Sequence, residues 1–509
     1  MLLVNPPVAK PCEPPAGITR LAGAIKEAGY DCRLLDLNIG GILWLAGRDS
    51  LKADTWSSRA ARNRSRNLDA LRNEATYRNS DRYRKTVSDL NRLLFAVLEG
   101  DTRISLNDYE DRTLSPVRTS DLSEAADHPE DNPFFPYFSD RLREAIGASP
   151  GTRVGFSMTY LSQALTTFAM LGFVRNTFPS ATIILGGALV TSWASNAPAK
   201  LDFGGLVDHL VAGPGEKFVL DMLGSATKSS KPVISQSFIF DDLPQSEYLA
   251  PGLIIPYSTS TGCYYGKCSF CPETAEGNPY IQLNPRSAAQ EMKRCVEKEH
   301  PALLHIVDNA ISPSVLKALI ADPPGVPWYG FVRITKELTD RDFCAGLKRS
   351  GCAMLKIGVE SGDREVLNAM RKGIELEHVS KALAAIRGAG IGTYVYLLFG
   401  TPWEDERAAR KTLDFVVEHR DFITFLNLAI FNLPHHSPDS WWVEPKPFYG
   451  GDLSFYSDFI HPKEWDRKKV RRFLDREFTR HPAIREIIRR QPPSFTSNHA
   501  AFFCHNGTF

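Results

Sequence analysis

The chain has 509 residues and an even charge balance, with 60 Lys and Arg against 59 Asp and Glu and a formal net charge of +1. This length leaves room for about two to four domains, each able to bury its own core. Hydrophobic residues make up 43% and charged residues 23%, which excludes a disordered or fibrous chain. The charge balance excludes a global positive field, so we expect neither nucleic acid nor a membrane as a partner.

The amino-terminal sequence carries no pattern typical of export. Its first residues lack the basic and apolar segments of a signal peptide. The longest nearly apolar run, 422–433, is shorter than the roughly 20 residues that span a bilayer. Nine cysteines are too few for a secreted disulfide framework in a chain of this length. We therefore expect a cytoplasmic protein in a reducing compartment.

The amino-terminal part of the chain alternates short apolar runs with segments of helical periodicity. Apolar residues recur at helical spacing from Ile18 to Ile25, and a second apolar helix is expected over 161–175. Strands are predicted at 2–4, 34–37, 154–158, 182–185 and 206–212. Strands that alternate with helices imply a parallel sheet, so we predict an α/β, Rossmann-like domain over residues 1–235.

A long polar segment, about 48–140, interrupts this domain. Arg, Asn, Ser and Asp dominate it, and helical patterns are visible near 68–77 and 87–98. A loop of this length is rarely structureless inside a compact domain, which favours an inserted helical lid or subdomain. A solvated, partly disordered loop is the alternative.

A second alternating series follows a polar linker at 225–237. Strands are predicted at 253–259, 303–307, 328–334, 354–359, 392–398 and 424–430, with helical patterns between them. Six strands are fewer than the eight of a closed TIM barrel. They predict a partial (β/α)6 TIM barrel over 245–440, or a doubly wound sheet, with ligands at the carboxyl ends of the strands. Residues 441–509 are expected to form a C-terminal extension with a charged helix over 464–480.

Three of the nine cysteines, Cys263, Cys268 and Cys271, form a C-x4-C-x2-C group after the first strand of the second series. Structural zinc takes four ligands, usually from two separated pairs, and no second Cys pair or His lies nearby in the sequence. Three thiolates fit an iron–sulfur cluster better, because the missing ligand leaves one iron open for substrate. Zinc and free thiols are the alternatives.

This cysteine group and the six-strand series resemble the radical S-adenosylmethionine (radical SAM) superfamily. The usual family spacing is C-x3-C-x2-C with an aromatic residue before the last Cys. Phe270 supplies the aromatic residue, but the first interval is one residue longer. The resemblance implies a [4Fe-4S] cluster whose fourth iron is chelated by the amino and carboxylate groups of S-adenosylmethionine (SAM). One-electron reduction then cleaves a carbon–sulfur bond of SAM, normally producing a 5′-deoxyadenosyl radical.

Further residues match the family at successive strand ends. Asp308, Asn309 and Ser312 follow the second strand, where the family places groups that face the SAM amine. A guanidinium suits a carboxylate, so Arg333 at the end of the third strand is expected to pair with the SAM carboxylate. The resemblance also implies SAM contacts from Phe270, Glu360, Ser361 and Tyr396. A surface ion pair is the alternative role for a single strand-end charge.

The amino-terminal domain resembles the cobalamin-binding domain of cobalamin-dependent radical SAM enzymes. Gly in its loops would let the backbone approach a bulky ring closely. The expected cobalamin contacts are Asn5, Pro6, Ser157, Thr159, Gly186, Gly187, Gly213, Gly215 and Glu216. The D-x-H-x-x-G motif, which supplies an axial His in other cobalamin proteins, is incomplete, because Asn38 stands in the His position after Asp36. A Rossmann-like domain without a cofactor is the alternative.

Together these features predict a radical SAM enzyme that transfers a methyl group from cobalamin to an unactivated carbon or phosphorus centre. The alternatives among enzymes are a cobalamin-independent rearrangement, a cyclisation, or 3-amino-3-carboxypropyl transfer, which cleaves a different carbon–sulfur bond of SAM. An iron–sulfur regulator or scaffold is the alternative outside enzymes. The expected partners are a small-molecule or peptide substrate and an electron donor such as a flavodoxin or ferredoxin.

The remaining cysteines show no grouping in the sequence. Isolated structural thiols are expected at Cys12, Cys32, Cys295, Cys344 and Cys352. No role is assigned to Cys504, because the tail that carries it could fold back toward the cluster.

Overall fold

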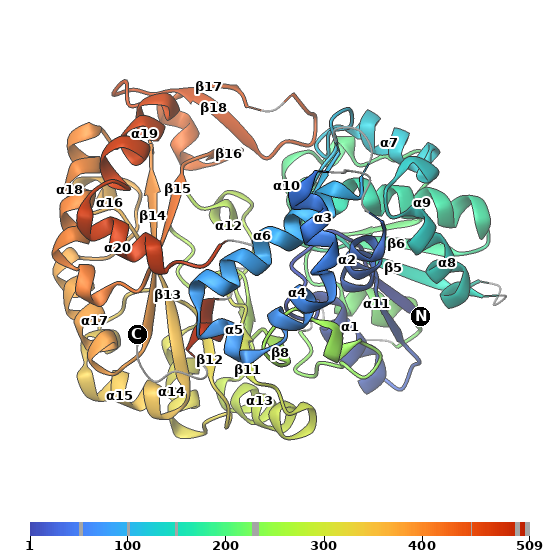
Figure 1. Cartoon of the computed structure of the whole chain (residues 1–509), viewed down its shortest axis with the longest axis horizontal. Coiled ribbons are helices and arrows are strands. Elements are labelled where there is room, and N and C mark those ends of the chain that lie inside the picture. Colours follow the sequence, from blue (N-terminus) through green and yellow to red (C-terminus); the bar gives the residue numbers. More distant parts are fainter. Residues whose placement is uncertain are drawn as a thin grey trace. The chain divides into compact units, whose positions relative to one another are not determined.

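A computed structural model describes the chain over residues 1–49, 54–98, 102–147, 151–225, 234–448, 450–493 and 499–503. The chain divides into two compact units, whose helices and strands are labelled in Figure 1. Unit 1 comprises Met1–Pro256, Tyr449–Ser454 and Pro493–Ser497, and unit 2 comprises Tyr257–Phe448, Phe455–Pro492 and Asn498–Phe509. Cys504, which the sequence left open, lies outside the described residues.

A five-stranded parallel sheet forms the centre of unit 1. Its strands stand in the order β2-β1-β5-β6-β7, and all neighbouring pairs are parallel. They are β1 (Leu2–Asn5), β2 (Arg33–Asp36), β5 (Arg153–Ser157), β6 (Thr182–Gly186) and β7 (His209–Val211). The predicted Rossmann-like sheet is therefore confirmed. Since β2 and β5 lie on opposite sides of β1, the strand order reverses between β1 and β5.

The last strand of this sheet is shorter than the prediction of 206–212. Ahead of β7, the carboxylate of Asp208 accepts a hydrogen bond from the N–H of Ile183 at 2.7 Å and pairs with Arg175 at 2.9 Å. The side chain of Asp208 therefore bonds to β6 at a position where the sequence predicted a strand, that is, pairing through the backbone alone.

Helices cover the sheet with buried apolar residues. In α1 (Ala16–Glu27) the buried positions include Ile18, Ala22 and Ile25, as the periodicity predicts. In α9 (Ala164–Thr177) every residue from Ala164 to Val174 is buried. Two helices of the inserted segment, α7 (Thr119–Asp127) and α8 (Phe135–Ile146), contact α9, which explains why it is apolar all round. The remaining helices of the sheet region are α2 (Leu37–Gly47), α10 (Ala188–Asn196) and α11 (Glu216–Met222).

The described part of the polar segment 48–140 is mainly helical. Besides α7 it contains α3 (Thr55–Arg62), α4 (Arg64–Leu71), α5 (Glu74–Tyr77), α6 (Ser80–Ala96) and two short strands, β3 (Arg103–Ile104) and β4 (Tyr109–Glu110). Its polar residues act as helix caps: the side chains of Asp54, Asn73 and Asn79 accept hydrogen bonds from N–H groups that begin α3, α5 and α6. The sequence indicated only two of these helices, because the others are too short for a clear period.

A six-stranded sheet has the order β15-β14-β13-β12-β11-β8, and all of its strands except most of β8 belong to unit 2. The strands are β8 (Ile254–Tyr257), β11 (Leu303–Ile306), β12 (Trp328–Val332), β13 (Cys352–Glu360), β14 (Gly392–Phe399) and β15 (Phe425–Ile430). The pairs from β11 to β15 are parallel. Each of these strands lies beside the one that precedes it in this series, as in a TIM barrel and unlike a doubly wound sheet. The predicted partial barrel is therefore confirmed.

The helices of the barrel are α13 (Pro285–Glu299), α14 (Pro313–Ala321), α15 (Arg341–Arg349), α16 (Arg364–Ala369), α17 (Leu376–Gly388) and α18 (Glu406–Glu418). Most begin at a polar cap; the side chains of Ser312, Asp363 and Asp405 each accept a hydrogen bond from the first turn of the helix that follows. These caps fix the loops at the carboxyl ends of the strands.

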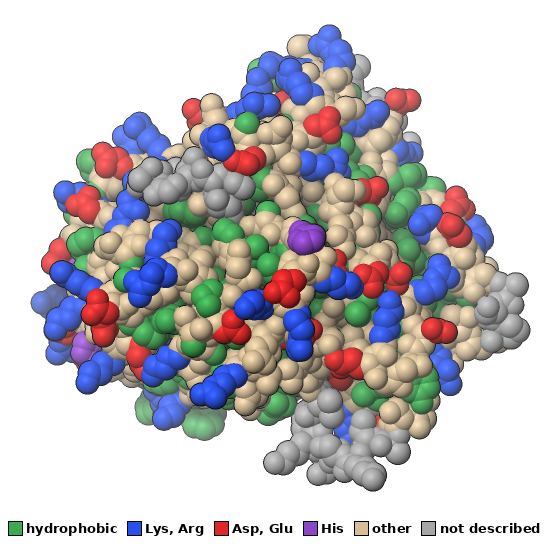
Figure 2. Space-filling model, turned by 90° about the horizontal axis from the view of Figure 1, so that it is seen from below, with side chains coloured by type: hydrophobic (Ala, Val, Ile, Leu, Met, Phe, Trp, Pro, Cys, Tyr) green, Lys and Arg blue, Asp and Glu red, His purple; other side chains and the backbone are tan. Residues whose placement is uncertain are grey.

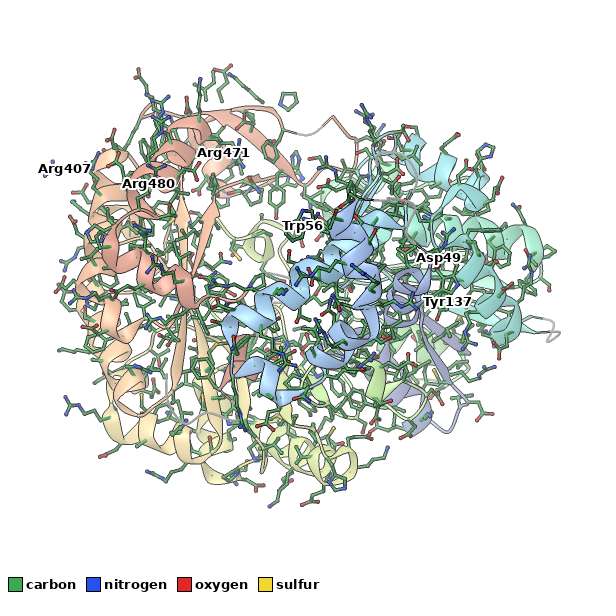
Figure 3. All side chains as sticks on the ribbon, viewed as in Figure 1. Asp49, Trp56, Tyr137, Arg407, Arg471 and Arg480 are labelled. Atoms are coloured by element: carbon green, nitrogen blue, oxygen red, sulfur yellow. The ribbon has the colours of Figure 1, made fainter. Side chains whose placement is uncertain are left out.

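The C-terminal part of unit 2 adds a small antiparallel sheet and two basic helices. The strands are β16 (Leu433–Pro434), β17 (Glu444–Pro447) and β18 (Tyr456–Ile460), and the helices are α19 (Arg467–Phe473) and α20 (Pro482–Arg490). The predicted helix over 464–480 begins later, because the side chain of Asp466 caps α19, and it changes to a π-helical turn over Leu474–Phe478. Figure 3 labels three exposed arginines of unit 2: Arg471 in α19, Arg480 just before α20, and Arg407 in α18.

Within unit 2 the end of the described chain lies at the amino-terminal end of the barrel strands. The ring of Phe503 covers Gly392, the first residue of β14, and its centroid lies 5.8 Å from that of Phe425 at the start of β15. The cysteines follow the carboxyl end of β8, so residue 503 lies at the other end of the strands.

None of the described helices is long and apolar enough to cross a membrane. Basic and acidic side chains are interspersed on the face of the molecule shown in Figure 2, as the near-zero net charge suggests.

The approach of α7 to α9 predicts the effect of one substitution. A Cβ at Gly172 in α9 would lie 1.8 Å from the carbonyl oxygen of Ala126 in α7. Ala favours a helix over Gly by about 1 kcal/mol, but overpacking costs roughly 1–3 kcal/mol. We expect Gly172→Ala to lower the urea midpoint of unit 1, measured by circular dichroism.

Gly388→Ala is the matched control for this helix substitution. Gly388 ends α17, and a Cβ there meets no atom within 4 Å, so its midpoint should equal or exceed that of the wild type. A Gly172→Ala midpoint that is not lowered would contradict the close packing of α7 on α9.

Candidate functional site

The three grouped cysteines lie on the cysteine loop (residues 262–271), which follows β8 and the short strand β9 (Ser260–Thr261) in unit 2. Cys268 is buried, Cys263 and Cys271 are half-buried, and all three are free thiols. The loop ends where α12 (Pro272–Ala275) begins, directly after Cys271. Burial raises the pKa of Cys271 to about 11, although the N–H groups of Glu273 and Thr274 lower it in part. The cysteines therefore stand at the carboxyl end of a barrel strand, as predicted.

A neighbouring loop of the barrel holds the cysteine loop through backbone carbonyls. The N–H of Ser269 donates to the carbonyl of Met370 at 3.0 Å, and the hydroxyl of Tyr265 donates to the carbonyl of Arg371 at 2.9 Å. Gly373 leaves the space in which the Tyr265 hydroxyl lies, because a Cβ there would come within 2.0 Å of it. The loop before α17 thus forms one wall of the site.

Arg333 links these two loops. Its guanidinium lies 3.4 Å from the ring centroid of Tyr265, donates to the carbonyl of Lys372 at 2.6 Å, and comes within 3.7 Å of the sulfur of Cys268. Burial raises the pKa of the Cys268 thiol, while Lys372 and Arg333 lower it. Nearby cations favour a thiolate, which is the form that binds metal.

A buried ion pair lies beside Cys268. The ammonium of Lys372 is 2.8 Å from Glu360 and 5.5 Å from the ring centroid of Phe270. Glu360 has a φ of +68° next to a register shift in β13, which turns its side chain at the strand end. Gly358 makes room for the pair, because a Cβ there would lie 2.3 Å from the Glu360 carboxylate and 2.8 Å from the Lys372 ammonium.

The predicted residues after β11 hold the start of the cysteine loop. The buried carboxylate of Asp308 accepts hydrogen bonds from the N–H groups of Thr259 and Ser260 at 2.7 and 3.2 Å, and from both hydroxyls. The amide of Asn309 donates to the carbonyl of Gly262 at 3.3 Å. Ser312 caps α14. Burial raises the pKa of Asp308, and the four hydrogen bonds lower it in part.

The last two predicted SAM residues face different surroundings. Tyr396 lies among aromatic rings, with centroids 4.9 Å from Phe331 and 4.8 Å from Tyr394. Ser361 is fully buried, and its hydroxyl lies 3.3 Å from that of Thr412 in α18. The structure thus brings Cys268, Phe270, Arg333 and Glu360 together around Lys372, whereas Ser361 lies against a helix.

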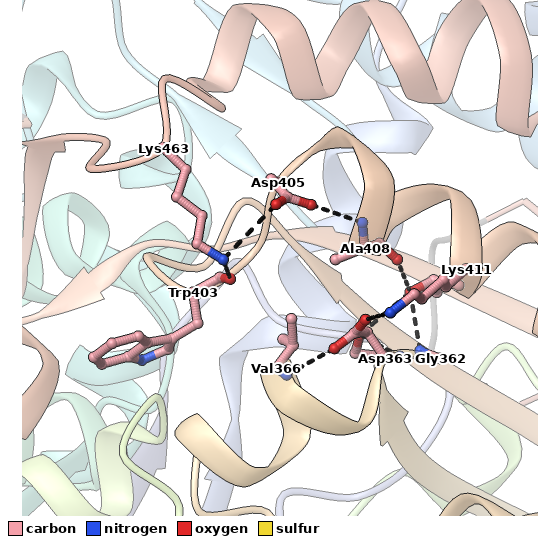
Figure 4. A network of polar contacts seen from close by, with 10 residues as sticks. Gly362, Asp363, Val366, Trp403, Asp405, Ala408, Lys411 and Lys463 are labelled. Atoms are coloured by element: carbon pink, nitrogen blue, oxygen red, sulfur yellow. Dashed lines mark hydrogen bonds and ion pairs between the residues drawn. The ribbon is translucent and has the colours of Figure 1, made fainter.

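A polar network fixes the loops that follow β13 and β14 (Figure 4). Asp363 caps α16 and pairs with Lys411 of α18 at 2.5 Å, while Thr412 accepts a hydrogen bond from the N–H of Gly362 at 2.9 Å. Asp405 caps α18 and lies 3.9 Å from Lys463. The two strand-end loops are held in place by side chains of one helix and of the C-terminal segment.

In unit 1, several predicted cobalamin residues meet around Gln163. The amide of Gln163 donates to Asn5 at 3.2 Å and to the carbonyl of Pro6 at 2.7 Å, and its carbonyl accepts from the N–H of Thr159 at 2.8 Å. Gln163 is fully buried. Asn5 and Ser157 end β1 and β5, so this network lies where the strand order reverses.

The other predicted cobalamin residues follow β6 and β7. A Cβ at Gly187, where φ is +111°, would lie 2.3 Å from the carbonyl of Met158, so only Gly fits beside Gly186 at this turn. Gly213 and Gly215 form the loop after β7, and the buried carboxylate of Glu216 pairs with Arg20 of α1 at 2.7 Å. The carboxylate of Glu216 is therefore occupied by an ion pair within unit 1.

Asp36 and Asn38 of the incomplete D-x-H-x-x-G motif are buried, and both are hydrogen-bonded within unit 1. Asp36 accepts hydrogen bonds from Asn5, from the hydroxyl of Tyr248 and from the N–H of Asn38. Asn38 in turn accepts from the N–H of Ala9 at 2.7 Å and is 1% exposed. Position 38 therefore ties the loop after β1 to α2.

Sequence reasoning missed Lys372 and Gln163, the centres of the two clusters. Neither belongs to a spaced motif, and each finds its partners across the fold. A positive charge shortly after the Glu360-Ser361-Gly362 strand end was a weak signal for Lys372; no signal in the sequence marked Gln163.

A cavity of about 520 Å³ lies beside β2, lined mainly by residues of β2, α2, α8 and segment 241–247. None of the predicted cobalamin residues lines it. Among the described residues, no three His, Cys, Asp or Glu side chains converge closely enough to hold a single metal ion. The cofactor contacts of both units therefore stay predictions.

Comparison with protein families identifies the core of unit 2. Residues 257–416 match the family described as the radical SAM superfamily. The matched range begins at the last residue of β8, includes the three cysteines and ends within α18.

Two curated proteins are similar to parts of the chain. The bacteriochlorophyllide d C-12(1)-methyltransferase of Chlorobaculum tepidum is 27% identical over 188 residues, 35% of this chain and 41% of that protein. The hopanoid C-3 methylase of Methylococcus capsulatus is 23% identical over 349 residues, 62% of this chain and 65% of that protein. The chain therefore matches less than two thirds of the length of either relative.

Two solved structures share the fold over nearly the whole chain. The radical SAM methyltransferase TsrM from Kitasatospora setae, with tryptophan and a SAM analogue bound, has a TM-score of 0.58 at 16% identity and covers 92% of this chain and 87% of its own. TsrM has also been solved with cobalamin and a [4Fe-4S] cluster. OxsB, solved with aqua-cobalamin, has a TM-score of 0.56 at 12% identity and covers 93% and 66%. At these identities the likeness is one of fold.

A buried carboxyl group after β14 predicts a pH-dependent stability. Glu404 is fully buried and accepts hydrogen bonds from the N–H of Gly400 at 2.5 Å and the indole of Trp465 at 2.9 Å. Burial raises its pKa from 4.5 to about 7. The folded protein therefore keeps a proton that the unfolded chain releases, so the contribution to stability is complete below pH 4.5 and is lost as pH rises through about 7.

Glu404→Gln removes this proton while keeping an acceptor and the shape of the side chain. Between pH 5 and pH 8, the wild type should lose up to roughly 3 kcal/mol more unfolding free energy than the variant, measured by urea titration. Glu406→Gln, an exposed position in the next turn, is the control and should follow the wild type. Equal losses in the wild type and Glu404→Gln would contradict the raised pKa.

Proposed function

Residues 257–416 are a radical SAM domain, and from this premise we propose that the chain is a cobalamin-dependent radical SAM methyltransferase. The acceptor is an unactivated carbon or phosphorus centre. The observation that carries the proposal is the C-x4-C-x2-C loop at the carboxyl end of β8, the first strand of the partial barrel. The names of the two curated relatives and of TsrM describe methyl transfer, which supports this choice among radical SAM reactions.

In this proposal Cys263, Cys268 and Cys271 hold a [4Fe-4S] cluster, which together with SAM supplies the reductive cleavage of a carbon–sulfur bond. The donor set fits the cluster, because it offers three thiols on one loop and two cations, Arg333 and Lys372, that favour the thiolate of Cys268. Buried loop contacts exclude water from Cys268. The protein therefore contributes ligation, charge and shielding.

The SAM contacts divide into direct and indirect roles. The guanidinium of Arg333 is the proposed partner of the SAM carboxylate; its stacking on Tyr265 fixes its orientation before SAM binds, which lowers the entropic cost of binding. Phe270, Asn309, Ser312, Glu360 and Tyr396 are further proposed contacts. Asp308 is hydrogen-bonded to Thr259 and Ser260, and Ser361 to Thr412 of α18, so we propose that these two buried residues position neighbouring segments instead of touching SAM.

Unit 1 is the proposed cobalamin domain. Ligands of open parallel sheets bind beyond the carboxyl ends of the strands where the strand order reverses, which here is the edge that carries Asn5 and Ser157. Pro6 and Thr159 follow these two strands, Gly186 and Gly187 lie at the end of β6, and Gly213 and Gly215 follow β7. Asn38 is buried against Ala9, so we propose that cobalamin binds without an axial ligand from position 38. TsrM and OxsB, which share the fold, have been solved with cobalamin.

The reaction also needs a reductant and a suitable compartment. We propose a flavodoxin or ferredoxin as the electron donor, a small molecule or peptide as the substrate, and the cytoplasm as the location. The eight described cysteines are all free thiols, which fits a reducing compartment.

Substitution of the cysteines tests the cluster. The anaerobically reconstituted wild type should hold four iron and four sulfide per chain and cleave SAM when reduced. Cys263→Ala, Cys268→Ala and Cys271→Ala should each lose most of the iron. Cys344→Ala, which removes a buried thiol of α15, is the matched control and should retain the iron. 5′-Deoxyadenosine production by the triple variant would refute the assignment.

Methyl transfer is tested with cobalamin and labelled SAM. We expect one hydroxocobalamin per chain, followed by its visible spectrum, and transfer of a deuterated methyl group from SAM to an acceptor, identified by mass spectrometry of candidate substrates. SAM cleavage without any cobalamin binding would favour the cobalamin-independent reactions. Failure of the reduced, reconstituted protein to cleave SAM would favour a regulator or scaffold.

A further inference from the structure

A turn of the C-terminal segment of unit 2 reaches the cysteine loop from outside the matched range 257–416. This clamp turn (residues 437–440) follows β16 and consists of Ser437 and the first three residues of the short 3-10 helix Pro438–Trp442. Ser437 is 0% exposed and Asp439 is 2% exposed, so the polar groups of the turn are out of solvent. Buried polar groups require partners, and their partners show what the turn holds.

Ser437 holds the segment between the last two cysteines. Its hydroxyl donates to the carbonyl of Ser269 at 2.7 Å. The N–H of Ser269 donates to the carbonyl of Met370 on the other side. Both polar groups of the Ser269 backbone are therefore paired with loops outside the cysteine loop, and the backbone that separates Cys268 from Cys271 is fixed from two directions.

Two contacts keep the Ser437 hydroxyl in position. It accepts a hydrogen bond from the N–H of Asp439 at 3.2 Å, which leaves its own hydrogen free for Ser269. The hydroxyl of Ser440 donates to the Ser437 carbonyl at 2.6 Å, which closes the turn. These two contacts therefore orient the Ser437 hydroxyl so that it donates to the carbonyl of Ser269.

Asp439 connects the turn to the loop after β14. Its carboxylate accepts a hydrogen bond from the indole of Trp403 at 3.4 Å. Trp403 stands next to Glu404 and Asp405, in a loop that Lys463 also holds through the Trp403 carbonyl. The clamp turn is therefore anchored on one side in the barrel and reaches the cysteine loop on the other.

We propose that Ser437 and Asp439 are positioning residues of the cysteine loop, which set the spacing of the Cys268 and Cys271 sulfurs for the cluster. The inference rests on the proposed function, in that this loop is assigned to hold the cluster. It adds that the cluster site is completed by the C-terminal segment. Ser437 acts through the backbone of Ser269, and Asp439 acts through Ser437 and through its contact with Trp403.

Hydrogen exchange in the metal-free protein tests the clamp independently of the cluster. In Ser437→Ala, the amides of residues 268–271 should exchange about 3- to 10-fold faster than in the wild type, the factor that one ordinary hydrogen bond provides. Exchange in the strands of the barrel should stay unchanged. Ser437→Thr, which keeps the hydroxyl, should restore slow exchange. Uniformly faster exchange throughout unit 2, or no change at 268–271, would overturn the proposal.

Iron retention tests the consequence for the cluster. After reconstitution, Ser437→Ala and Asp439→Ala should lose iron to a chelator faster than the wild type and show a broadened electron paramagnetic resonance signal, whereas Ser437→Thr should not. Ser380→Ala is the matched control, because this hydroxyl in α17 donates to the Leu376 carbonyl and lies 2.7 Å from His419, away from the cysteine loop. Equal iron loss in Ser437→Ala and Ser380→Ala would contradict the clamp.

The two proposals fail in different ways. A wild type that never binds iron but shows the selective exchange change in Ser437→Ala would refute the cluster and leave the clamp as a loop contact. A wild type that holds four iron, with Ser437→Ala unchanged in exchange and iron loss, would refute the clamp and leave the cluster.

Discussion

The constraint on which the site of unit 2 depends is that buried backbone groups at the carboxyl ends of the barrel strands must find partners. The cysteine loop contains no helix or strand, so its peptide groups have no regular ladder to join. The N–H of Ser269 is paired with the carbonyl of Met370, and the carbonyls of Gly262 and Ser269 accept from the side chains of Asn309 and Ser437. Asp308 accepts from the N–H groups of the residues just before the loop. Asp308 and Asn309 follow β11, Met370 lies between β13 and β14, and Ser437 follows β16, so partners from three separate segments meet at the cysteine loop.

Charged side chains are also concentrated at this site. The Lys372–Glu360 pair is nearly buried, with side chains 8% and 12% exposed, and such a pair is seldom a source of stability, because desolvation offsets the attraction. Its position suggests a different role. Together with Arg333 it places a carboxylate and two cations within one small region beside Cys268, where a cofactor with charges of both signs is proposed to bind. Gly358 leaves the space that the pair occupies, and the register shift in β13 lies directly beside Glu360.

Much of the architecture could be predicted from the sequence, because the strands of both sheets are continuous apolar runs and their alternation with helices determines a parallel sheet. The cysteines were found by spacing, and strand-end residues such as Arg333 and Glu360 by their place after an apolar run. Lys372, Gln163 and Ser437 could not be found in this way. Gln163 and Ser437 act on partners 158 and 168 residues away, and Lys372 pairs with Glu360 12 residues away across the end of β13 and accepts from Arg333 39 residues away; none of them belongs to a spaced motif. In the inserted segment the sequence indicated helices near 68–77 and 87–98, and the other helices were missed because they are too short for a clear period.

The even charge balance of the chain conceals an uneven distribution. Residues 467–490, which include α19 and α20, hold ten Lys and Arg against three Asp and Glu, so this segment carries +7 and the rest of the chain −6. The apolar residues Val470, Phe473, Ile484 and Ile487 are buried, whereas the arginines at 471, 472, 480 and 485 are exposed. Unit 2 therefore carries a concentrated positive region on one set of helices. Any attraction between this region and an anionic surface therefore depends on local charge that the net charge of the chain does not report, and it weakens as ionic strength rises.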